Sequence, residues 1–210
     1  NYTACSGNNG GNYATLNSLE FYGATAAMSN GNLDVAITSG SGFYPASRPT
    51  ISPFTAGKKY YCEVTIGSKT STFQSVGANT MPHYMTGSGD QYVIWRSDGQ
   101  LSENVSGSSR TGSGGTYTNG DLIGIAYDNS TQELKFYKNN LLAVTWTFSS
   151  IPENFNLYTG TDSTGGTGNF TWNFGQRPFA YTPPTGFLSL CTTNLPDPTI
   201  ADGSTAFDVV

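Results

Sequence analysis

Apolar and polar positions alternate most regularly between residues 120 and 148, where the pattern predicts three consecutive β-strands. Residues 122–127 are apolar on both faces, which is typical of a strand buried between two layers. Residues 133–138 alternate instead, so that Leu134 and Phe136 point to the same side of the strand. This meander predicts architecture, and architecture alone does not state a function.

Turn residues separate the three predicted strands. Residues 128–131 include Asp and Asn side chains, which can hydrogen-bond to their own backbone. Asn139 and Asn140 predict a two-residue hairpin loop, because asparagine accepts a positive φ at both central positions. The returning strand is predicted to carry its apolar side chains on one face: Leu142, Val144, Trp146 and Phe148.

Shorter apolar runs predict further strands, among them residues 33–37, 58–66, 73–76, 91–95, 155–159 and 170–174. One face of the second run carries Tyr60, Cys62, Val64 and Ile66. Three prolines make residues 39–53 a loop or a sheet edge, because proline cannot donate to a ladder. No long segment shows a helical period. About ten short strands spaced roughly 8 to 12 residues apart therefore predict an all-β sandwich or barrel.

Composition divides the chain into a leader, a domain and an arm. Residues 1–12 are rich in Gly, Asn and Ser and predict a flexible leader, and residues 105–115 predict a flexible polar loop. The strands lie within 13–180, and recurring prolines predict an extended arm at 181–210. Apolar residues in and just before this arm must pack on the domain or on a neighbour: Phe179, Tyr181, Phe187, Leu188 and Leu190. Because the chain starts without Met and ends on an apolar run, we expect it to lead into a further domain.

Three segments resemble the SPRY domain family. Residues 57–64 (GKKYYCEV) resemble its early GKYYWEV strand, and residues 120–140 resemble its GDVIGVALDLDTGELSFYKNG meander. Residues 173–179 (NFGQRPF) resemble its closing NFGQ-PF segment, and the resemblance as a whole covers residues 13–180. The chain departs from the pattern at Cys62, where the family usually has Trp, so the core there must be filled differently.

The resemblance implies a bent antiparallel β-sandwich of two sheets, concanavalin-like, without catalytic activity. It also implies partner binding through variable loops at one end of the sandwich. The matching motif residues would then be scaffold: Gly124, Asp128, Leu134, Phe136, Tyr137 and Gly175. The late segment PTGFLSLCTTNLPDPTI additionally resembles SPRY-containing virion and tail-fibre proteins of tailed bacteriophages.

Charge and cysteine usage narrow the functional classes. Charged residues make up 11% of the chain, against about 25% in an average soluble domain. This composition suits an extracellular or particle-borne β protein, and a net charge of −5 argues against a nucleic-acid partner. No apolar run is long enough to predict membrane insertion. The three dispersed cysteines suggest buried apolar side chains, with a Cys5–Cys191 bridge left open.

The chain offers little catalytic chemistry. His83 is the only histidine, and no G-x-S-x-G nucleophile motif is present. One histidine and three scattered cysteines do not predict a zinc site, and residues 128–130 are better explained as an Asx turn than as a calcium loop. We therefore expect no enzymatic activity, no metal and no cofactor.

Candidate ligand-binding residues are bulky or planar side chains in the predicted loops at 43–50, 79–96 and 105–117. Aromatic rings stack on sugar faces or anchor protein partners, and arginine adds planar hydrogen bonding. Tyr92 and Trp95 are equally consistent with core positions of a strand. The full set is His83, Tyr84, Tyr92, Trp95, Arg96, Tyr117, Phe43 and Tyr44.

These observations predict a non-enzymatic adhesion or structural module on the virion of a tailed bacteriophage, as a tail fibre or a capsid decoration. Its expected partners are a host-surface glycan or protein, or neighbouring virion proteins, and it is expected to be a homo-oligomer in the particle. Three alternatives remain: a purely architectural module that locks subunits together, a cellular SPRY adaptor that binds peptides, and a glycan-cleaving enzyme.

Overall fold

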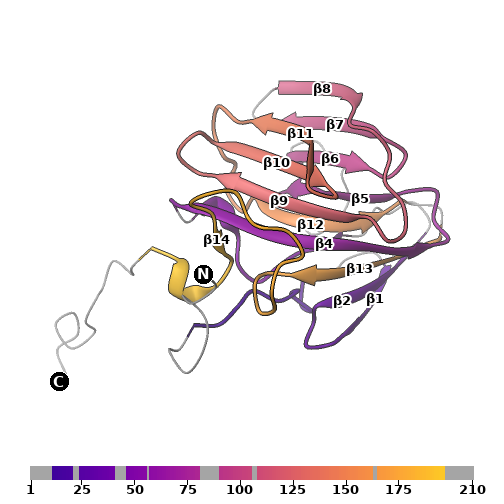
Figure 1. The fold of residues 1–210 in the computed structure, drawn as a ribbon. Helices are drawn as coiled ribbons and strands as arrows, with labels where there is room; N and C mark the ends of the chain where they lie inside the picture. Colours follow the sequence, from indigo (N-terminus) through magenta and orange to yellow (C-terminus); the bar gives the residue numbers. More distant parts are fainter. Residues whose placement is uncertain are drawn as a thin grey trace, which may run out of the picture.

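Two antiparallel sheets stack face to face in the computed structural model, which describes residues 11–20, 24–40, 46–55, 57–80, 90–105, 108–162 and 165–196 (Figure 1). The larger sheet has the order β1 (Ala24–Ser29), β2 (Asp34–Ser39), β13 (Thr167–Asn173), β4 (Lys59–Lys69), β9 (Leu122–Asp128), β10 (Glu133–Lys138) and β11 (Leu141–Thr147). A short strand, β14 (Leu188–Ser189), pairs with β4 in parallel.

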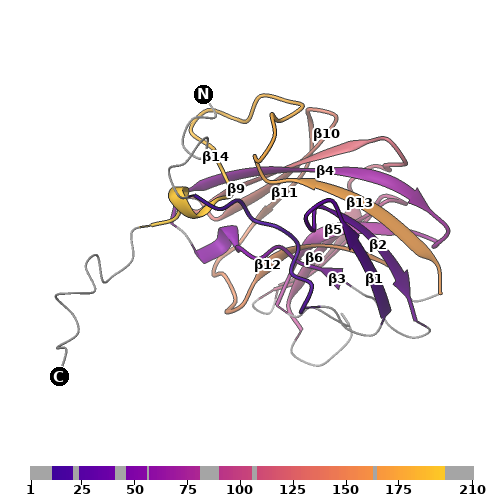
Figure 2. The ribbon, with the colours of Figure 1, turned by 90° about the horizontal axis from the view of Figure 1, so that it is seen from below.

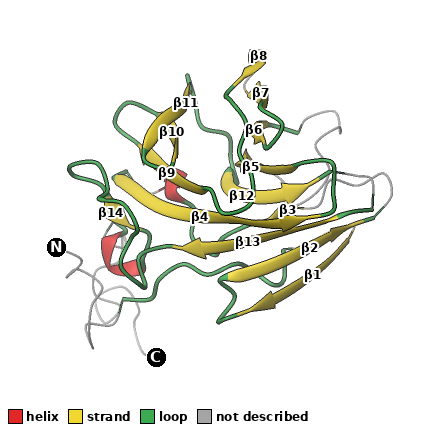
Figure 3. Ribbon diagram, turned by 45° about the vertical axis from the view of Figure 1, so that its right-hand side comes forward, coloured by secondary structure: helices red, strands yellow, loops and turns green. Residues whose placement is uncertain are grey.

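The smaller sheet has the order β3 (Ala46–Ser47), β12 (Asn156–Thr161), β5 (Gln74–Asn79), β6 (Tyr92–Arg96), β7 (Gln100–Val105) and β8 (Ser108–Ser113). The helices in the described ranges are two 3-10 turns, η1 (Pro53–Thr55) and η2 (Thr192–Asn194), drawn red in Figure 3. Seen from below, the sheets form two layers (Figure 2). The predicted all-β sandwich is confirmed.

The core lies between the two layers and follows the predicted alternation. Leu134 and Phe136 are fully buried on the inner face of β10. The predicted inner face of β4 is also buried in this core: Tyr60, Cys62, Val64 and Ile66. Apolar side chains of both sheets therefore exclude water along the whole sandwich, which is the main source of its stability.

The meander forms as predicted except at one position. Asn139 and Asn140 have positive φ values of 47° and 70°, as the hairpin requires. On β11, however, Phe136 pairs with Val144 while Tyr137 pairs with Leu142, so one extra residue bulges from the strand. The bulge reverses the alternation, and the prediction that Leu142 shares the inner face is wrong: this side chain is 56% exposed.

Residues 108–113 also differ from the prediction of a flexible loop. They form β8, which pairs with β7 from Gln100↔Ser113 to Val105↔Ser108. Backbone groups alone make this ladder, so a strand forms at the sheet edge without apolar side chains. The lack of an apolar pattern at 108–113 therefore led to the wrong prediction of a loop.

The arm folds back onto its own domain as far as it is described. Leu188 of β14 pairs with Tyr60 beside the larger sheet, where the yellow segment runs in Figure 1. Phe179 packs edge-on against Tyr61 with ring centroids 5.0 Å apart, and Leu190 is 1% exposed. Of the two alternatives for the apolar arm, packing on the domain is the one observed for these residues.

The two cysteines that the structure describes differ in their bonding state. Cys62 is free and buried, as predicted for an apolar side chain. Cys191 is disulfide-bonded, which corrects the simple interpretation of all three as buried thiols. Cys5, the remaining cysteine of the sequence, lies outside the described residues.

Candidate functional site

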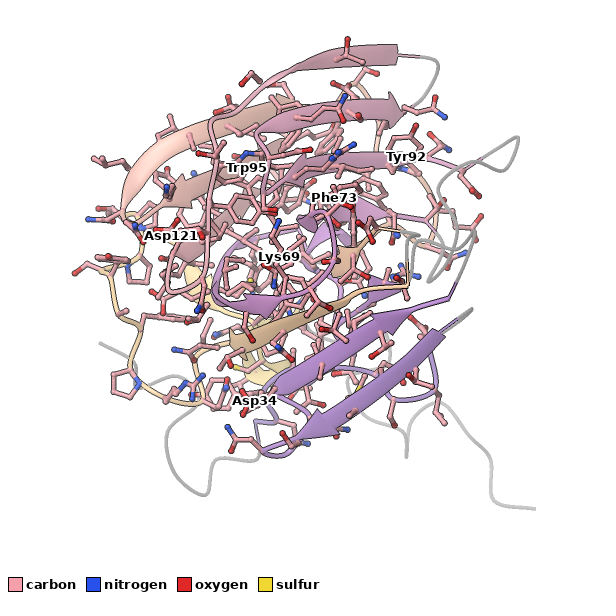
Figure 4. The ribbon with its side chains drawn as sticks, turned by 90° about the vertical axis from the view of Figure 1, so that its right-hand side faces the viewer. Asp34, Lys69, Phe73, Tyr92, Trp95 and Asp121 are labelled. Atoms are coloured by element: carbon pink, nitrogen blue, oxygen red, sulfur yellow. The ribbon has the colours of Figure 1, made fainter. Side chains whose placement is uncertain are left out.

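The strand register defines two ends of the sandwich. Ser75 pairs with Arg96 near one end, and Asn79 pairs with both Tyr92 and Asn156 near the other. We call the first end, with connections 70–73, 97–99, 114–121 and 139–140, the loop end; Figure 4 looks onto it. The predicted binding loops therefore do not gather at a single end, because residues 80–91 start and finish at the opposite one.

Two predicted ligand-binding residues belong to the core. Trp95 is fully buried, and its indole Nε1–H donates to the Gly115 carbonyl at 2.8 Å. Tyr117 is 3% exposed, and its hydroxyl lies 3.0 Å from the Gln74 carbonyl and 2.9 Å from the Trp95 carbonyl. Burial keeps both rings away from any ligand, so their assignment as contact residues is corrected to a structural role.

The remaining candidates have different positions. Tyr92 is half-buried and packs with Ile94 and Tyr158 on the outer face of the smaller sheet. Arg96 lies at the loop end and is described below. The other four candidates, His83, Tyr84, Phe43 and Tyr44, lie outside the described residues.

Arg96 is held in place at the loop end. Its guanidinium carbon lies 3.6 Å from the centroid of the Phe73 ring, within cation–π range. Arg96 Nε and Nη2 donate to the two carboxylate oxygens of Asp98, at 3.2 and 2.5 Å, and Nη1 donates to Gln100 Oε1. The planar group is therefore ordered before any partner arrives.

Neighbouring connections extend this surface to the β10–β11 hairpin. The Gly114 N–H donates to the Gly99 carbonyl at 2.9 Å, which joins the Arg96 side to the β8–β9 connection. Lys138 Nζ donates to the Thr116 carbonyl at 2.9 Å, and this brings the hairpin alongside. The exposed residues Leu141 and Leu142 come directly after the Asn139–Asn140 turn. We define the loop-end surface as Arg96, Asp98, Gln100, Thr116, Lys138, Leu141 and Leu142.

Asp121 fixes the hairpin side of this surface. Burial alone would raise the pKa of its carboxyl, but hydrogen bonds from Thr118 N, Asn139 Nδ2 and Lys138 outweigh burial and lower the pKa. The Lys138 ammonium lies 3.1 Å from Asp121 Oδ2. A charged Asp121 thus ties the β8–β9 connection to the β10–β11 turn.

A groove of about 690 Å³ opens at the other end, within the usual size range of ligand pockets. We call it the Arg48 groove. Three separate parts of the chain line it: residues 17–20, residues 48–54 and residues 151–156, with Thr80 beside them. Its polar lining includes Asn17, Glu20, Arg48, Thr50, Glu153 and Asn154.

Arg48 is the least expected residue of this groove, because it is a charged side chain only 5% exposed. Its Nη2 donates to the carbonyls of Asn154 and Asn79, and its Nη1 lies 3.6 Å from Glu20 Oε2. Burial lowers the pKa of Arg48, and the Glu20 carboxylate acts in the opposite direction. The Nε–H is buried without a partner.

Sequence reasoning included 43–50 among the predicted binding loops, but its candidate binding residues included neither Arg48 nor any other residue that lines the groove. Arg48 follows a two-residue strand and precedes a proline, a context that carries no sign of a buried charge. The groove exists only because residues more than 100 positions apart meet there, as in the Arg48–Asn154 hydrogen bond.

The part of the chain that the structure describes offers no candidate metal centre. No group of three or more His, Cys, Asp or Glu side chains among the described residues could hold a metal ion. No helix in these ranges is long and apolar enough to cross a membrane.

Two antiparallel sheets packed face to face, with their connections at the two ends, define the fold class as a β-sandwich. The model of the SPRY domain family matches residues 59–177, more than half of the chain, and the chain belongs to this family of protein-interaction modules. No curated protein matches it.

Solved SPRY structures share the fold. The SPRY domain of human HERC1 is 15% identical, with a TM-score of 0.53, over 78% of this chain and 99% of that one. A human SPRY domain is 20% identical, with a TM-score of 0.50, over 76% of this chain and 99% of the other. At these identities the likeness describes the fold alone.

Proposed function

We propose that the chain is a non-enzymatic adhesion module that binds a protein partner through the loop-end surface. The observation that carries this proposal is the presence of an ordered arginine, Arg96, and two exposed leucines, Leu141 and Leu142, near the same end of the sandwich. Leu141 is 75% exposed and Leu142 is 56% exposed. Arginine is enriched among the few residues that supply most of the affinity in protein interfaces, and the leucines add apolar area that leaves water on binding.

The Arg96 arrangement suits binding because it is preorganised. The guanidinium already has its ring and carboxylate neighbours, so little side-chain entropy is lost when a partner covers it. Leu141 and Leu142 leave water on contact, which contributes a favourable hydrophobic term. A protein surface with an apolar patch and a hydrogen-bond acceptor beside it would complement this face.

We place the module on the surface of a tailed-phage virion, in a tail fibre or capsid decoration and as a homo-oligomer. The low charge and the phage-like arm segment support this context. The disulfide at Cys191 also supports it, because disulfides persist in oxidising surroundings and are rare in the cytosol. Host-surface proteins or glycans and neighbouring virion proteins are its proposed partners. A cytosolic peptide-binding adaptor is the alternative that the disulfide disfavours.

A purely architectural role is the second alternative, in which the arm and leader lock subunits together. The described part of the arm is already engaged with its own domain, for example through Phe179 on Tyr61. This contact leaves those side chains unable to bridge to a neighbour without detaching first.

The test uses three kinds of particle. The first carries Leu141→Ser and Leu142→Ser together, the second carries Arg96→Ala, and the control carries Leu19→Ser. Leu19 is a matched control because it is 91% exposed and adjoins residues that line the Arg48 groove, at the other end. We expect slower adsorption to host cells or loss of a neighbouring virion protein for the loop-end variants only. Unchanged adsorption and composition in the loop-end variants would refute the proposal.

A further inference from the structure

We propose that the Arg48 groove is a second binding site and that its ligand is a neutral saccharide. This inference extends the proposed adhesion function but rests on different residues at the opposite end of the sandwich. A groove of about 690 Å³ has room for a small ligand, and ligand pockets are commonly of this size. The class of ligand follows from the groups that line it.

The lining mixes hydrogen-bond acceptors and donors. Glu20 and Glu153 contribute carboxylates, which only accept, while the amides of Asn17 and Asn154 both donate and accept. Thr50 adds a hydroxyl. Sugar hydroxyls also donate and accept, so a chain of them can satisfy such a mixed set.

Apolar side chains form another part of the wall. Phe54, Ile151 and Pro152 line the same groove. The C–H faces of a pyranose ring are apolar, and they gain from contact with such side chains as they leave water. A fully charged ligand would gain nothing from this part of the groove.

Charge argues against an anionic ligand. Among the described residues that line the groove, Arg48 is the one basic group. It is 5% exposed and already donates to Asn154 and Asn79, whereas the two glutamates lie nearer solvent. A phosphate or an acidic peptide would therefore meet carboxylates before it met the guanidinium. A neutral polyhydroxylated ligand avoids this repulsion.

Arg48 itself is a positioning residue of the groove. Its bonds to two carbonyls tie the 151–156 connection to the end of β5. Because a guanidinium has several donors in a fixed plane, one side chain can hold both backbone segments. The groove is thus shaped before a ligand enters, which lowers the entropic cost of binding.

The test is saturation-transfer NMR and calorimetry of the whole chain with a panel of neutral oligosaccharides, and with an oligolysine peptide as a rival ligand. Glu153→Gln and Asn17→Ala probe the groove, and Thr25→Ala, an exposed position on β1 outside both proposed surfaces, is the control. We expect at least one neutral oligosaccharide to bind, with at least fivefold weaker binding in both groove variants and unchanged binding in Thr25→Ala.

Three results would overturn this assignment. The first is no saccharide binding at millimolar concentration, and the second is saccharide binding that is equally strong in the groove variants and the parent chain. The third is tight oligolysine binding that is lost in Glu153→Gln. The last result would identify a basic peptide as the occupant. Failure here leaves the loop-end proposal standing, because adsorption of the Leu141 and Leu142 variants is measured separately.

Discussion

The Glu63 carboxylate on β4 accepts the backbone N–H of Tyr181, 118 positions later in the chain, at 3.0 Å. Its other oxygen accepts the N–H of Ala180 at 2.9 Å, and the Tyr61 hydroxyl lies 3.2 Å from Oε1. Glu63 is only 2% exposed. A buried carboxylate is costly unless it is well bonded, and here the arm supplies the donors.

Replacing Glu63 with alanine should detach the start of the arm. Hydrogen bonds to a buried charge contribute about 1.5–3 kcal/mol each, so we expect the free energy of unfolding to fall by at least about 2 kcal/mol. Urea denaturation measures this loss, and amide exchange should speed up at Ala180 and Tyr181. Thr65→Ala, on the same face of β4, is the control; equal effects in both variants would contradict a specific role for Glu63.

Cys62, a free thiol, and Cys191, a disulfide-bonded residue, lead to different predictions. Cys62 is 2% exposed, and burial raises the pKa of its thiol, so we expect no labelling by iodoacetamide in the native protein. Cys191→Ser should lower the free energy of unfolding by about 2–4 kcal/mol, since the disulfide restricts the unfolded chain. Rapid native labelling of Cys62, or no loss of stability in Cys191→Ser, would count against these assignments.

Tyr117→Phe should destabilise the protein without touching the binding surfaces. The hydroxyl lies within hydrogen-bonding distance of the carbonyls of Gln74 and Trp95 inside the core. Its loss removes one donor from the core, while the Gln74 carbonyl keeps the N–H of Ser97, so we expect a cost of about 0.5–1.5 kcal/mol. The comparison is Tyr92→Phe at a half-buried position, expected within about 0.5 kcal/mol of the parent chain. Thermal unfolding of the two variants decides whether Tyr117 is a core residue or a contact residue.

The sequence predicted the parts of the fold that depend on local periodicity. The buried β9 strand, the β10 alternation and the Asn139–Asn140 hairpin follow from side-chain period and turn chemistry within a few residues. The strand β8 did not, because it is held by backbone pairing with β7 and has no apolar signature.

The candidate sites depend on contacts between distant segments and were harder to predict. Arg96 was identified, but Phe73 beneath it comes from another part of the chain. Trp95 and Tyr117 are aromatic and sit near predicted loops, yet packing between the sheets buries them. Leu142 was assigned to the wrong face because a bulge depends on the neighbouring strand and not on the local sequence.

Acid should weaken the link between the β8–β9 connection and the β10–β11 turn. The bonds from Thr118, Asn139 and Lys138 hold the pKa of Asp121 below its ordinary value of 3.8 in the folded protein. A group with a lowered folded pKa contributes stability above its unfolded pKa and loses it as pH falls through the folded value. This contribution is therefore fully present well above pH 3.8 and is lost as the pH falls through the lowered folded value.

Asp128 behaves in the same way at the other end of β9. Burial would raise its pKa, but Lys59 at 2.7 Å and Ser130 lower it overall.

We expect the free energy of unfolding, followed by urea denaturation between pH 2 and pH 6, to rise with pH over the acid range. Lys138→Met and Lys59→Met should each flatten this dependence, since they remove a cation that favours the ionised carboxylate. Lys69→Met is the control, because its ammonium bonds to Thr72 O and Ser97 Oγ and to neither aspartate. If Lys69→Met flattens the pH dependence of the free energy of unfolding as much as Lys138→Met and Lys59→Met do, Asp121 and Asp128 do not set that dependence.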